Sequence, residues 1–538
     1  MIRIQNIPLP LDGDLEQLRK KAARILGVRP GALEELTLVH QSIDARKKQD
    51  VHYVYTVDVS LRTGEEQAVE RTGKKNVSLV LPKPYLFPEV KRRSPSMPVV
   101  VGMGPAGLFA ALFLARNGLP CVVLERGQDV DRRTAQVERF WDSGLLDPSS
   151  NVQFGEGGAG TFSDGKLTTG THDPRISAVI DALVESGAPE DVKWSHKPHI
   201  GTDILRQVVK RIRQELISLG CDVRFGHCLS GLETGSGALS GVWVACEAGR
   251  YRLDCDALVL APGHSARDTF AMLHKRGVPM EAKPFAVGVR IEHRQADCDA
   301  AQYRQYAGHP GLPVSTYKLS CHLPGGRAAY SFCVCPGGEV VAAASEAERV
   351  VTNGMSEFAR DKENINGGLL VNVTPEDYGG AEDPLAGIAF QRKLESAAYA
   401  LGGGDYRAPA QRVGDFLAGR PSVGPGRVHP SYRPGVTWTD LRRCLPPFVA
   451  DTIAGALPLL GQKLRGYDDP DAVLTAVESR SSSPVRILRD ADSYQSPIAG
   501  LYPCGEGAGY AGGILSAAAD GLRCAEKILT CGQEGSDV

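Results

Sequence analysis

The chain has 538 residues, of which 42% are hydrophobic, and its formal net charge is -2. This length predicts about two to four domains with a substantial core, and the near-neutral charge gives no reason to expect binding to nucleic acid or to a membrane surface. No apolar run approaches the length of a membrane span and the N-terminus lacks a signal-peptide core, so we expect a cytoplasmic protein.

Residues 1–80 form the first predicted unit, a small α+β module. Its hydrophobic patterns predict three strands, at 2–7, 36–44 and 53–61, and one amphipathic helix at 14–26. The basic cluster Arg46-Lys47-Lys48 is interpreted as a solvated loop, with a bound phosphate or a partner as the alternative. Residues 81–97 are rich in proline and basic side chains, which predicts a stiff linker.

The segment 98–127 carries the most informative pattern in the chain. It predicts a buried strand at 99–101, a glycine turn with Gly102, Gly104 and Gly107, an apolar helix at 108–116 and a second strand at 121–124. In such a βαβ unit the three glycines permit a tight turn, the approach of a pyrophosphate and close packing of the helix on the strand. Glu125 lies about twenty residues past the glycines, where a carboxylate reaches a ribose hydroxyl. The segment therefore predicts a dinucleotide site.

Two later segments favour FAD as this dinucleotide. An apolar strand in 255–263 ends at a Pro-Gly turn, and 500–522 combines a short strand, Gly505-Glu506 and a small-residue helix. Rossmann domains that bind only a nicotinamide cofactor lack this closing element, whereas FAD lies extended across a sheet assembled from distant parts of the chain. We predict a discontinuous FAD-binding domain over 98–283 and 481–531.

A glycine-rich stretch, 154–169, follows the βαβ unit. So many glycines are costly in backbone entropy, which favours a cofactor or substrate loop over a flexible surface loop. Beyond it a helix (203–219), a strand (222–225) and a polar hairpin region that reaches residue 253 predict a small β meander within the domain.

Residues 284–480 predict a separate substrate domain whose sheet covers the flavin. One strand is expected over 284–293, and a hairpin is expected to join 328–335 to 340–344 across Pro336-Gly337-Gly338. No metal is expected, because the chain has no HExxH, paired CxxC or clustered histidine motif.

Cys333 and Cys335 are the one close pair among 13 cysteines. On a strand their side chains would point to the same face. We interpret them as two small residues in a half-buried strand, with a thiol next to the flavin or substrate as the alternative. The absence of CxxC argues against a thioredoxin-type disulfide or an iron–sulfur cluster.

Several long motifs occur in order over nearly the whole chain: VVVGMGPAGLFAALFLA, FGEGGAGTFSDGKL, FAVGVRIEH, FCVCPGGEVV, NGMS, VESRSSSPVRI and GLYPCGEGAGYAGGI. With them the chain resembles the uncharacterised FAD-dependent dehydrogenases. The resemblance implies an α/β fold: a glutathione-reductase-type, Rossmann-like FAD-binding domain, a mixed α+β substrate domain and a small N-terminal α+β domain. It implies no particular substrate.

By this resemblance the three glycines of the first turn cradle the FAD pyrophosphate and Glu125 holds the adenosine ribose. Glu506 stands where related flavoproteins commonly have Asp, and its extra methylene shifts the expected ribityl contact. The helix that begins in 513–517 would point its dipole at the flavin pyrimidine edge. The predicted cofactor-binding residues are Gly102, Gly104, Pro105, Ala106, Gly107, Glu125, Arg126, Gly157, Gly158, Ala261, Gly263, Gly505, Glu506, Gly513 and Ile514.

The flavin itself carries the hydride, so the sequence needs no recognisable catalytic triad and leaves the catalytic residues unknown. The candidates for substrate binding or proton transfer are Lys166, Arg290, Glu292, Cys333, Cys335 and Arg480. For each charged candidate taken singly, a structural ion pair is the favoured interpretation and a role toward the substrate is the alternative. Lys166 and Arg480 lie in glycine- or serine-rich loops, which suggests an anionic group on the substrate.

The leading hypothesis is an FAD-dependent oxidoreductase that transfers a hydride between flavin and an unidentified small organic substrate. No second GxGxxG unit follows, so NAD(P)H would bind transiently over the flavin if it is the donor. One alternative is a flavin-binding adaptor with structural FAD, whose N-terminal module recruits a protein partner. Another is a flavoenzyme acting on RNA through the Arg46 cluster and Arg92-Arg93, against which the near-neutral charge argues.

Overall fold

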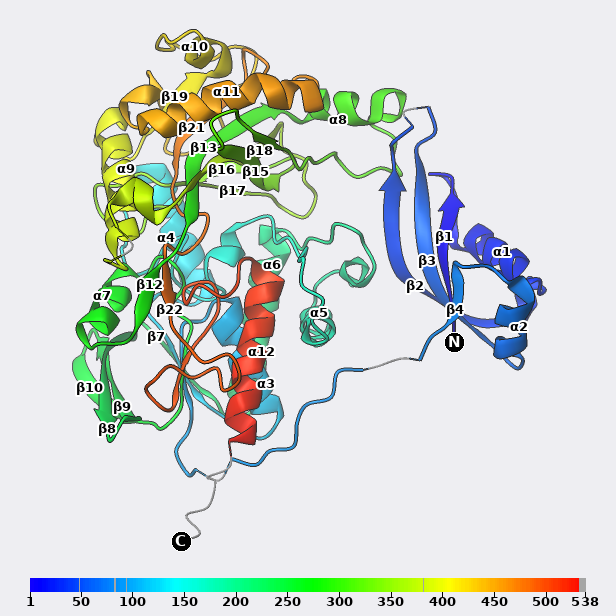
Figure 1. Cartoon of the computed structure of the whole chain (residues 1–538), viewed down its shortest axis with the longest axis horizontal. Helices are drawn as coiled ribbons and strands as arrows, with labels where there is room; N and C mark the ends of the chain where they lie inside the picture. Colours follow the sequence, from blue (N-terminus) through cyan, green and yellow to red (C-terminus); the bar gives the residue numbers. More distant parts are fainter. Residues whose placement is uncertain (48, 82–83, 93, 381, 532–538) are drawn as a thin grey trace.

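The computed structural model has three parts: an N-terminal module, a domain built on a parallel sheet and a domain built on a larger mixed sheet (Figure 1). It describes every residue except 48, 82–83, 93, 381 and 532–538. Lys48 and Arg93, both predicted as phosphate contacts in alternative hypotheses, lie outside the described residues. Within the described ranges, none of the helices has both the length and the apolar composition that crossing a membrane requires.

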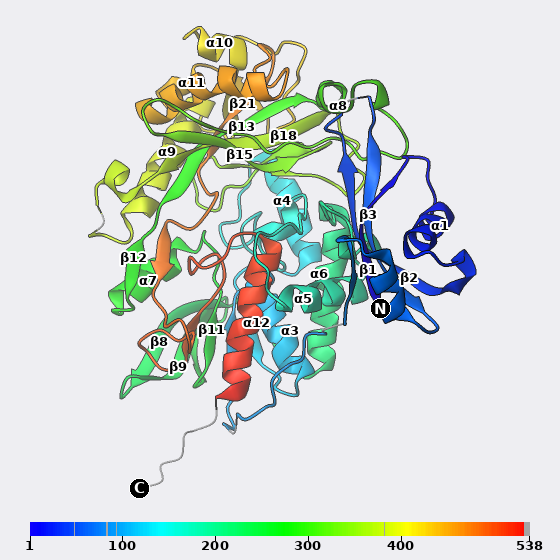
Figure 2. The same cartoon turned by 45° about the vertical axis from the view of Figure 1, so that its right-hand side comes forward.

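The N-terminal module is a four-stranded antiparallel sheet in the order β2-β3-β1-β4, with two helices beside it (Figure 2). Its elements are β1 (Ile2–Leu9), α1 (Leu15–Leu26), β2 (Leu33–Asp44), β3 (His52–Leu61), α2 (Glu65–Thr72) and β4 (Val77–Leu79). Asp14 begins α1 by accepting a hydrogen bond from the Gln17 amide at 2.7 Å. The sequence patterns do not indicate α2, because Ala68 is the one buried residue of this short, charged helix.

The second domain has a five-stranded parallel sheet in the order β23-β11-β5-β6-β7. Its strands are β5 (Val99–Val101), β6 (Val122–Glu125), β7 (Asp222–Phe225), β11 (Leu258–Leu260) and β23 (Leu501–Pro503). β5, β6, β11 and β23 are buried along their whole length, which explains their apolar sequences. β23 pairs with β11, although more than two hundred residues separate them in the sequence, and it completes the predicted discontinuous sheet.

Two helices cross closely behind this sheet, α3 (Pro105–Arg116) and α12 (Ile514–Thr530). A Cβ atom on Gly521 of α12 would lie 2.1 Å from the Ala106 oxygen, so the glycine is required for this approach. α3 begins at Pro105, earlier than the predicted residue 108, because proline is compatible with the first turn of a helix.

The remaining elements of this domain surround the sheet. They are α4 (Val130–Ser143), α5 (Arg175–Glu185), α6 (Thr202–Ser218), α7 (Arg267–Lys275), and the antiparallel meander β8 (Cys228–Gly235), β9 (Ala238–Cys246) and β10 (Gly249–Asp254). The meander confirms the predicted polar hairpin region. A two-stranded ribbon, β12 (Met280–Ala282) with β22 (Val485–Ile487), marks where the chain leaves this domain and returns.

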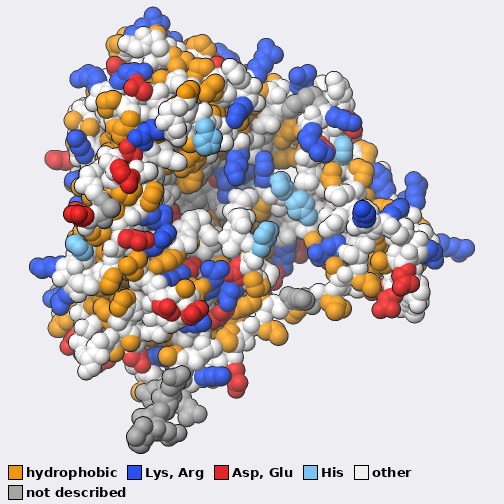
Figure 3. All heavy atoms as spheres, viewed as in Figure 1, with side chains coloured by type: hydrophobic (Ala, Val, Ile, Leu, Met, Phe, Trp, Pro, Cys, Tyr) orange, Lys and Arg blue, Asp and Glu red, His pale blue; other side chains and the backbone are white. Residues whose placement is uncertain are grey.

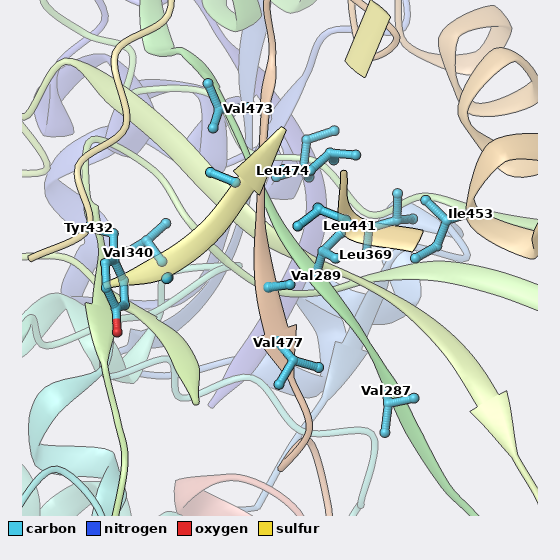
Figure 4. Close-up of a cluster of buried hydrophobic side chains, with 14 of the residues drawn as sticks. Val287, Val289, Val340, Leu369, Tyr432, Leu441, Ile453, Val473, Leu474 and Val477 are labelled. Carbon is cyan, nitrogen blue, oxygen red and sulfur yellow. The ribbon is translucent and has the colours of Figure 1, made fainter. Parts of the chain in front are cut away.

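The third domain is built on a seven-stranded sheet in the order β14-β15-β18-β13-β21-β19-β20. Its elements are β13 (Phe285–Arg294), α8 (Gln295–Tyr303), β14 (Ser320–His322), β15 (Ala328–Cys335), β16 (Glu339–Ala342), β17 (Thr352–Met355), β18 (Asn364–Val373), α9 (Ala386–Gly402), β19 (Ala408–Arg412), α10 (Val413–Leu417), β20 (Val436–Trp438), α11 (Pro447–Lys463) and β21 (Val473–Glu478). Its core joins Val289 of β13, Leu369 of β18 and Ile453 of α11 (Figure 4). This rigid sheet lies over the parallel-sheet domain (Figure 1).

The predicted hairpin between 328–335 and 340–344 is wrong. β15 pairs with β14 and β18, whereas β16 pairs with β17. The turn does not fold back, because Gly337 packs against the backbone of Arg360, whose oxygen would lie 1.8 Å from a Cβ there. Both strands are apolar, and only long-range packing selects their partners.

The N-terminal module contacts the second domain through the edge strand β2. The Gln41 amide donates to the Trp194 oxygen at 2.7 Å, and the His196 amide donates to the Gln41 oxygen at 2.8 Å. The ring nitrogens of His40 and His196 lie 3.1 Å apart. A short segment of the parallel-sheet domain therefore extends the module's sheet.

Candidate active site

A cavity of about 1630 Å³, counted out to open solvent, lies between the second and third domains. Residues of both domains line it. Gly102, Gly104, Pro105 and Ala106 line it at the start of α3. No side chain caps this helix, so its first-turn amides are available to a phosphate.

The loop 154–158 closes over this turn. Gly157 donates to the Met103 oxygen at 2.8 Å, and a Cβ on Gly158 would lie 2.8 Å from the Cα of Gly104. Gly158 lines the cavity, whereas Gly157 packs behind it against Thr161. Gly107 also packs behind the cavity, since its Cβ would lie 1.9 Å from the Gly102 oxygen. The glycine-rich stretch is therefore part of the cavity wall.

Glu125 joins these loops at the end of β6. Its carboxylate accepts hydrogen bonds from the amides of Met103 at 2.8 Å, Gly127 at 2.9 Å and Gly155 at 3.0 Å. A carboxylate offers about four acceptor positions, so one remains for a ribose hydroxyl. Glu125 lines the cavity and is 5% exposed.

The other predicted cofactor residues divide between the cavity surface and its support. Arg126, Ala261, Gly263, Glu506, Gly513 and Ile514 line the cavity. Arg126 stacks on Phe154 and donates to Asp268 and Thr269, each at 3.0 Å, so its guanidinium is already held. Gly505 supports the wall instead: its amide donates to Asp520 at 2.8 Å.

These features fit FAD. The cavity is surrounded by glycine contacts that a side chain would block, by uncapped amides at α3 and α12, and by an acidic residue with one open acceptor position. When bound there, FAD would supply hydride chemistry.

Comparisons with known proteins identify the family. Residues 98–151 match an FAD binding domain, residues 284–481 match the FAD-dependent protein C-terminal domain-like family, and residues 1–60 match a domain of unknown function. An uncharacterised protein of Clostridium beijerinckii is 46% identical over 538 residues, which cover 98% of each chain. The chain belongs to the uncharacterised FAD-dependent dehydrogenase family. It is a flavin oxidoreductase with an α/β FAD-binding fold.

Solved flavoenzymes show more distant similarity. A quinol fumarate reductase variant of E. coli is 12% identical, with 81% of this chain and 71% of that chain covered and a TM-score of 0.36. A glycerol-3-phosphate dehydrogenase of Bacillus halodurans, solved with FAD, is 12% identical, with 80% and 63% covered and a TM-score of 0.34. A flavin-dependent brominase is 11% identical, with 80% and 79% covered and a TM-score of 0.35.

Arg480 lines the cavity of the flavoprotein, but its charge is already paired. It donates twice to Glu395, at 2.9 Å each, and Arg267 forms a second bidentate pair with the same carboxylate, at 2.7 and 2.9 Å. Burial disfavours the charged form of Glu395, yet the two guanidinium groups lower its pKa. The structural ion pair is therefore the better interpretation of Arg480.

Arg290 and Glu292 are buried on β13 and do not line the cavity. Arg290 donates to Glu478 at 2.7 Å and to the Cys333 oxygen at 2.7 Å. Glu292 accepts from the Ser431 hydroxyl at 2.6 Å and from Asn364 at 3.0 Å. Internal partners hold both side chains, which agrees with the structural interpretation that the sequence favours for each of them singly.

Cys333 lines the cavity, whereas Cys335 is fully buried behind it. The strand is irregular here: Cys333 has a φ of +41° and the register shifts between Phe332 and Cys335. The Cys335 thiol donates to the backbone oxygen of Cys333 at 3.4 Å. The neighbouring Cys335 side chain, and then Lys166 and Arg290, lower the pKa of the Cys333 thiol. The regular strand on which the same-face prediction rests is therefore interrupted by a bulge at these two residues.

Lys166 lines the cavity and contacts Asp164 at 2.8 Å, and its ammonium also donates to the Val334 oxygen. Residues that the sequence patterns do not single out lie near it. Thr352, Asn353 and Glu478 line the cavity from β17 and β21. Burial raises the pKa of Glu478 to about 7, although Arg290 opposes this shift. NGMS and VESRSSSP contain Asn353 and Glu478, but these motifs alone do not reveal that the residues meet.

Proposed function

We propose that this flavoprotein catalyses hydride transfer between FAD and a small organic substrate that binds beneath the seven-stranded sheet. The observation that supports this proposal is the composition of one continuous cavity. The glycine loops of the parallel-sheet domain line part of it, and Cys333, Asn353 and Glu478 of the third domain line another part. A substrate held by the third domain would therefore share a cavity with the cofactor.

FAD would supply the hydride chemistry, so the protein has to bind, orient and desolvate the substrate. Asn353 offers an amide, although its oxygen also accepts from Arg290 at 2.9 Å. Glu478, with its pKa raised to about 7, is suited to hold or release a proton near neutral pH. The sheet above the cavity would exclude water from the reacting atoms.

NAD(P)H is proposed as a transient electron donor that binds over the flavin. The cavity lined by the glycine loops continues to Cys333, Asn353 and Glu478, which supports binding of a donor and then of a substrate beside the flavin.

The deciding experiment is an anaerobic absorbance spectrum of the purified protein before and after NADH, and then NADPH, is added. Rapid loss of the oxidised flavin band with either nucleotide would support a redox enzyme and identify its donor. If neither works, a panel of small organic acids, alcohols and amines is added to the oxidised protein. A flavin that dithionite reduces but that no donor or panel member reduces would contradict the proposal and favour structural FAD.

A further inference from the structure

A second group of charged side chains lies beside the cavity, around Asp164. This carboxylate is 1% exposed and accepts two hydrogen bonds from Arg360, at 2.9 and 2.6 Å. It also contacts the Lys166 ammonium at 2.8 Å. One carboxylate therefore serves two cations.

Lys197 adds a third cation to this group. Among the described residues, no hydrogen bond or ion pair reaches its ammonium. Lys197 is exposed on the surface. Partial desolvation, and then repulsion from Arg360 and Lys166, lower the pKa of its ammonium. Lys197 is thus a solvent-exposed cation beside a carboxylate that already serves two other cations.

Backbone pairing fixes these residues at the cavity. The Leu167 amide donates to the Pro198 oxygen at 2.9 Å, and the Ile200 amide donates to the Gly165 oxygen at 3.1 Å. The segments that carry Lys166 and Lys197 therefore run side by side. Asp164 and Lys166 line the cavity, whereas Arg360 reaches the group through its ion pair with Asp164 and Lys197 through the paired segment.

Histidine side chains lie beside this group. His199 stacks on Phe358, with ring centroids 5.3 Å apart, and its ring lies near Arg360 and Lys166. His196 faces His40 of the N-terminal module. Figure 3 shows Lys, Arg and His side chains gathered in the hollow between the main body and the module. An anion that enters this hollow would meet the charged group before it reaches the cavity.

We propose that Lys166, Lys197 and Arg360 bind an oxyanion, a carboxylate or phosphate group, of the substrate that the flavoprotein oxidises or reduces. This assignment rests on the proposed function, because it places the anionic end of the substrate at the cavity margin. Arg360 and Lys166 are oriented by Asp164, and Lys197 contributes the uncompensated charge. Arg480, the other predicted anion contact, pairs with Glu395 and lies near Glu346, so two carboxylates serve it and Arg267, and it plays no part in this site.

The test is calorimetric titration of the full-length, FAD-loaded protein with inorganic phosphate and, separately, with succinate. The loaded protein is used because bound FAD occupies the uncapped amides at α3, which would otherwise bind phosphate. We expect at least one of the two anions to bind, and which of them binds tells phosphate from carboxylate. Lys197→Met should weaken that binding about tenfold, and Lys197→Glu should weaken it further.

Lys193→Met is the matched control, because Lys193 lies four residues away and pairs with Asp181 at 2.8 Å. It should bind the anion as the wild type does. Failure of the wild type to bind either anion, or equal binding by Lys197→Met, would overturn the assignment. Neither measurement needs a donor or turnover, so a flavin that proves to be structural would refute the proposed function without altering these titrations.

Discussion

Gly104 and Gly158 meet backbone to backbone at the cavity wall. A Cβ on Gly158 would lie 2.8 Å from the Gly104 Cα, whereas a Cβ on Gly104 would lie 3.7 Å from the Gly158 Cα. The contact is thus asymmetric: the fold excludes a side chain at Gly158 and has room for a methyl group at Gly104. Gly158 is therefore a glycine that the fold requires, whereas Gly104 is one that we assign to the approach of the cofactor.

Gly104→Ala should therefore leave the fold intact and weaken FAD binding about tenfold or more, which corresponds to at least about 1.4 kcal/mol. The added methyl group would occupy the position at which backbone approaches the pyrophosphate. FAD titration of the apoprotein, followed by flavin fluorescence, measures the affinity. Thermal unfolding of the apoprotein checks the fold, and Gly107→Ala, with its Cβ 1.9 Å from the Gly102 oxygen, should unfold at a lower temperature. Unchanged FAD affinity in Gly104→Ala would argue against the assigned pyrophosphate turn.

Glu125→Ala should destabilise even the apoprotein, by about 3 kcal/mol or more. The substitution leaves the amides of Met103, Gly127 and Gly155 without their acceptor, and each unsatisfied buried donor costs about 1–3 kcal/mol. Urea unfolding of the apoprotein measures this loss. Glu34→Ala, which breaks an exposed pair with Arg62, should change stability by less than about 1 kcal/mol. Wild-type stability of Glu125→Ala would show that the carboxylate does not hold the loops.

Asp164 should make stability depend on pH in the acidic range. Burial favours its neutral form, but Lys166 and Arg360 outweigh burial and lower its pKa to about 2 from the ordinary 3.8. A lowered pKa in the folded state stabilises the fold above the unfolded value, and this contribution is lost as the pH falls from about 4 towards 2. The shift corresponds to about 2 kcal/mol.

The measurement is urea unfolding of wild type and Asp164→Asn at several pH values. The stability difference between the two proteins should be constant near neutral pH and should shrink as the pH falls below about 4. A difference that stays constant down to the acid limit of folding would refute the assigned ion pairs.

Cys333 should react with iodoacetamide faster than Cys228 near neutral pH. Both thiols line the cavity, but the Cys335 thiol and nearby cations lower the pKa of Cys333, whereas burial raises that of Cys228. The thiolate is the reactive form. Mass spectrometry of the FAD-free protein after timed alkylation measures both rates. Cys335→Ala should slow alkylation of Cys333, and an unchanged rate would exclude the thiol–thiol interaction.

The sequence alone determines the local elements of this protein. β5, the glycine turn, α3 and β6 lie within thirty residues, and their signals are local: apolar strands, three glycines and one acidic residue. The family resemblance rests on the same kind of contiguous motif. For this reason the fold class and the FAD-binding domain are predictable without coordinates.

Only the tertiary structure decides which distant segments meet. β15 and β16 are equally apolar, and their partners β18 and β17 follow from packing rather than from the tight turn between them. Glu395 neutralises Arg480 from α9, and internal partners bury Arg290. Lys197 becomes significant only because Lys166 and Arg360 approach it. The reason is physical: a side chain's charge and hydration depend on neighbours that chain folding brings from afar, and no local pattern specifies them.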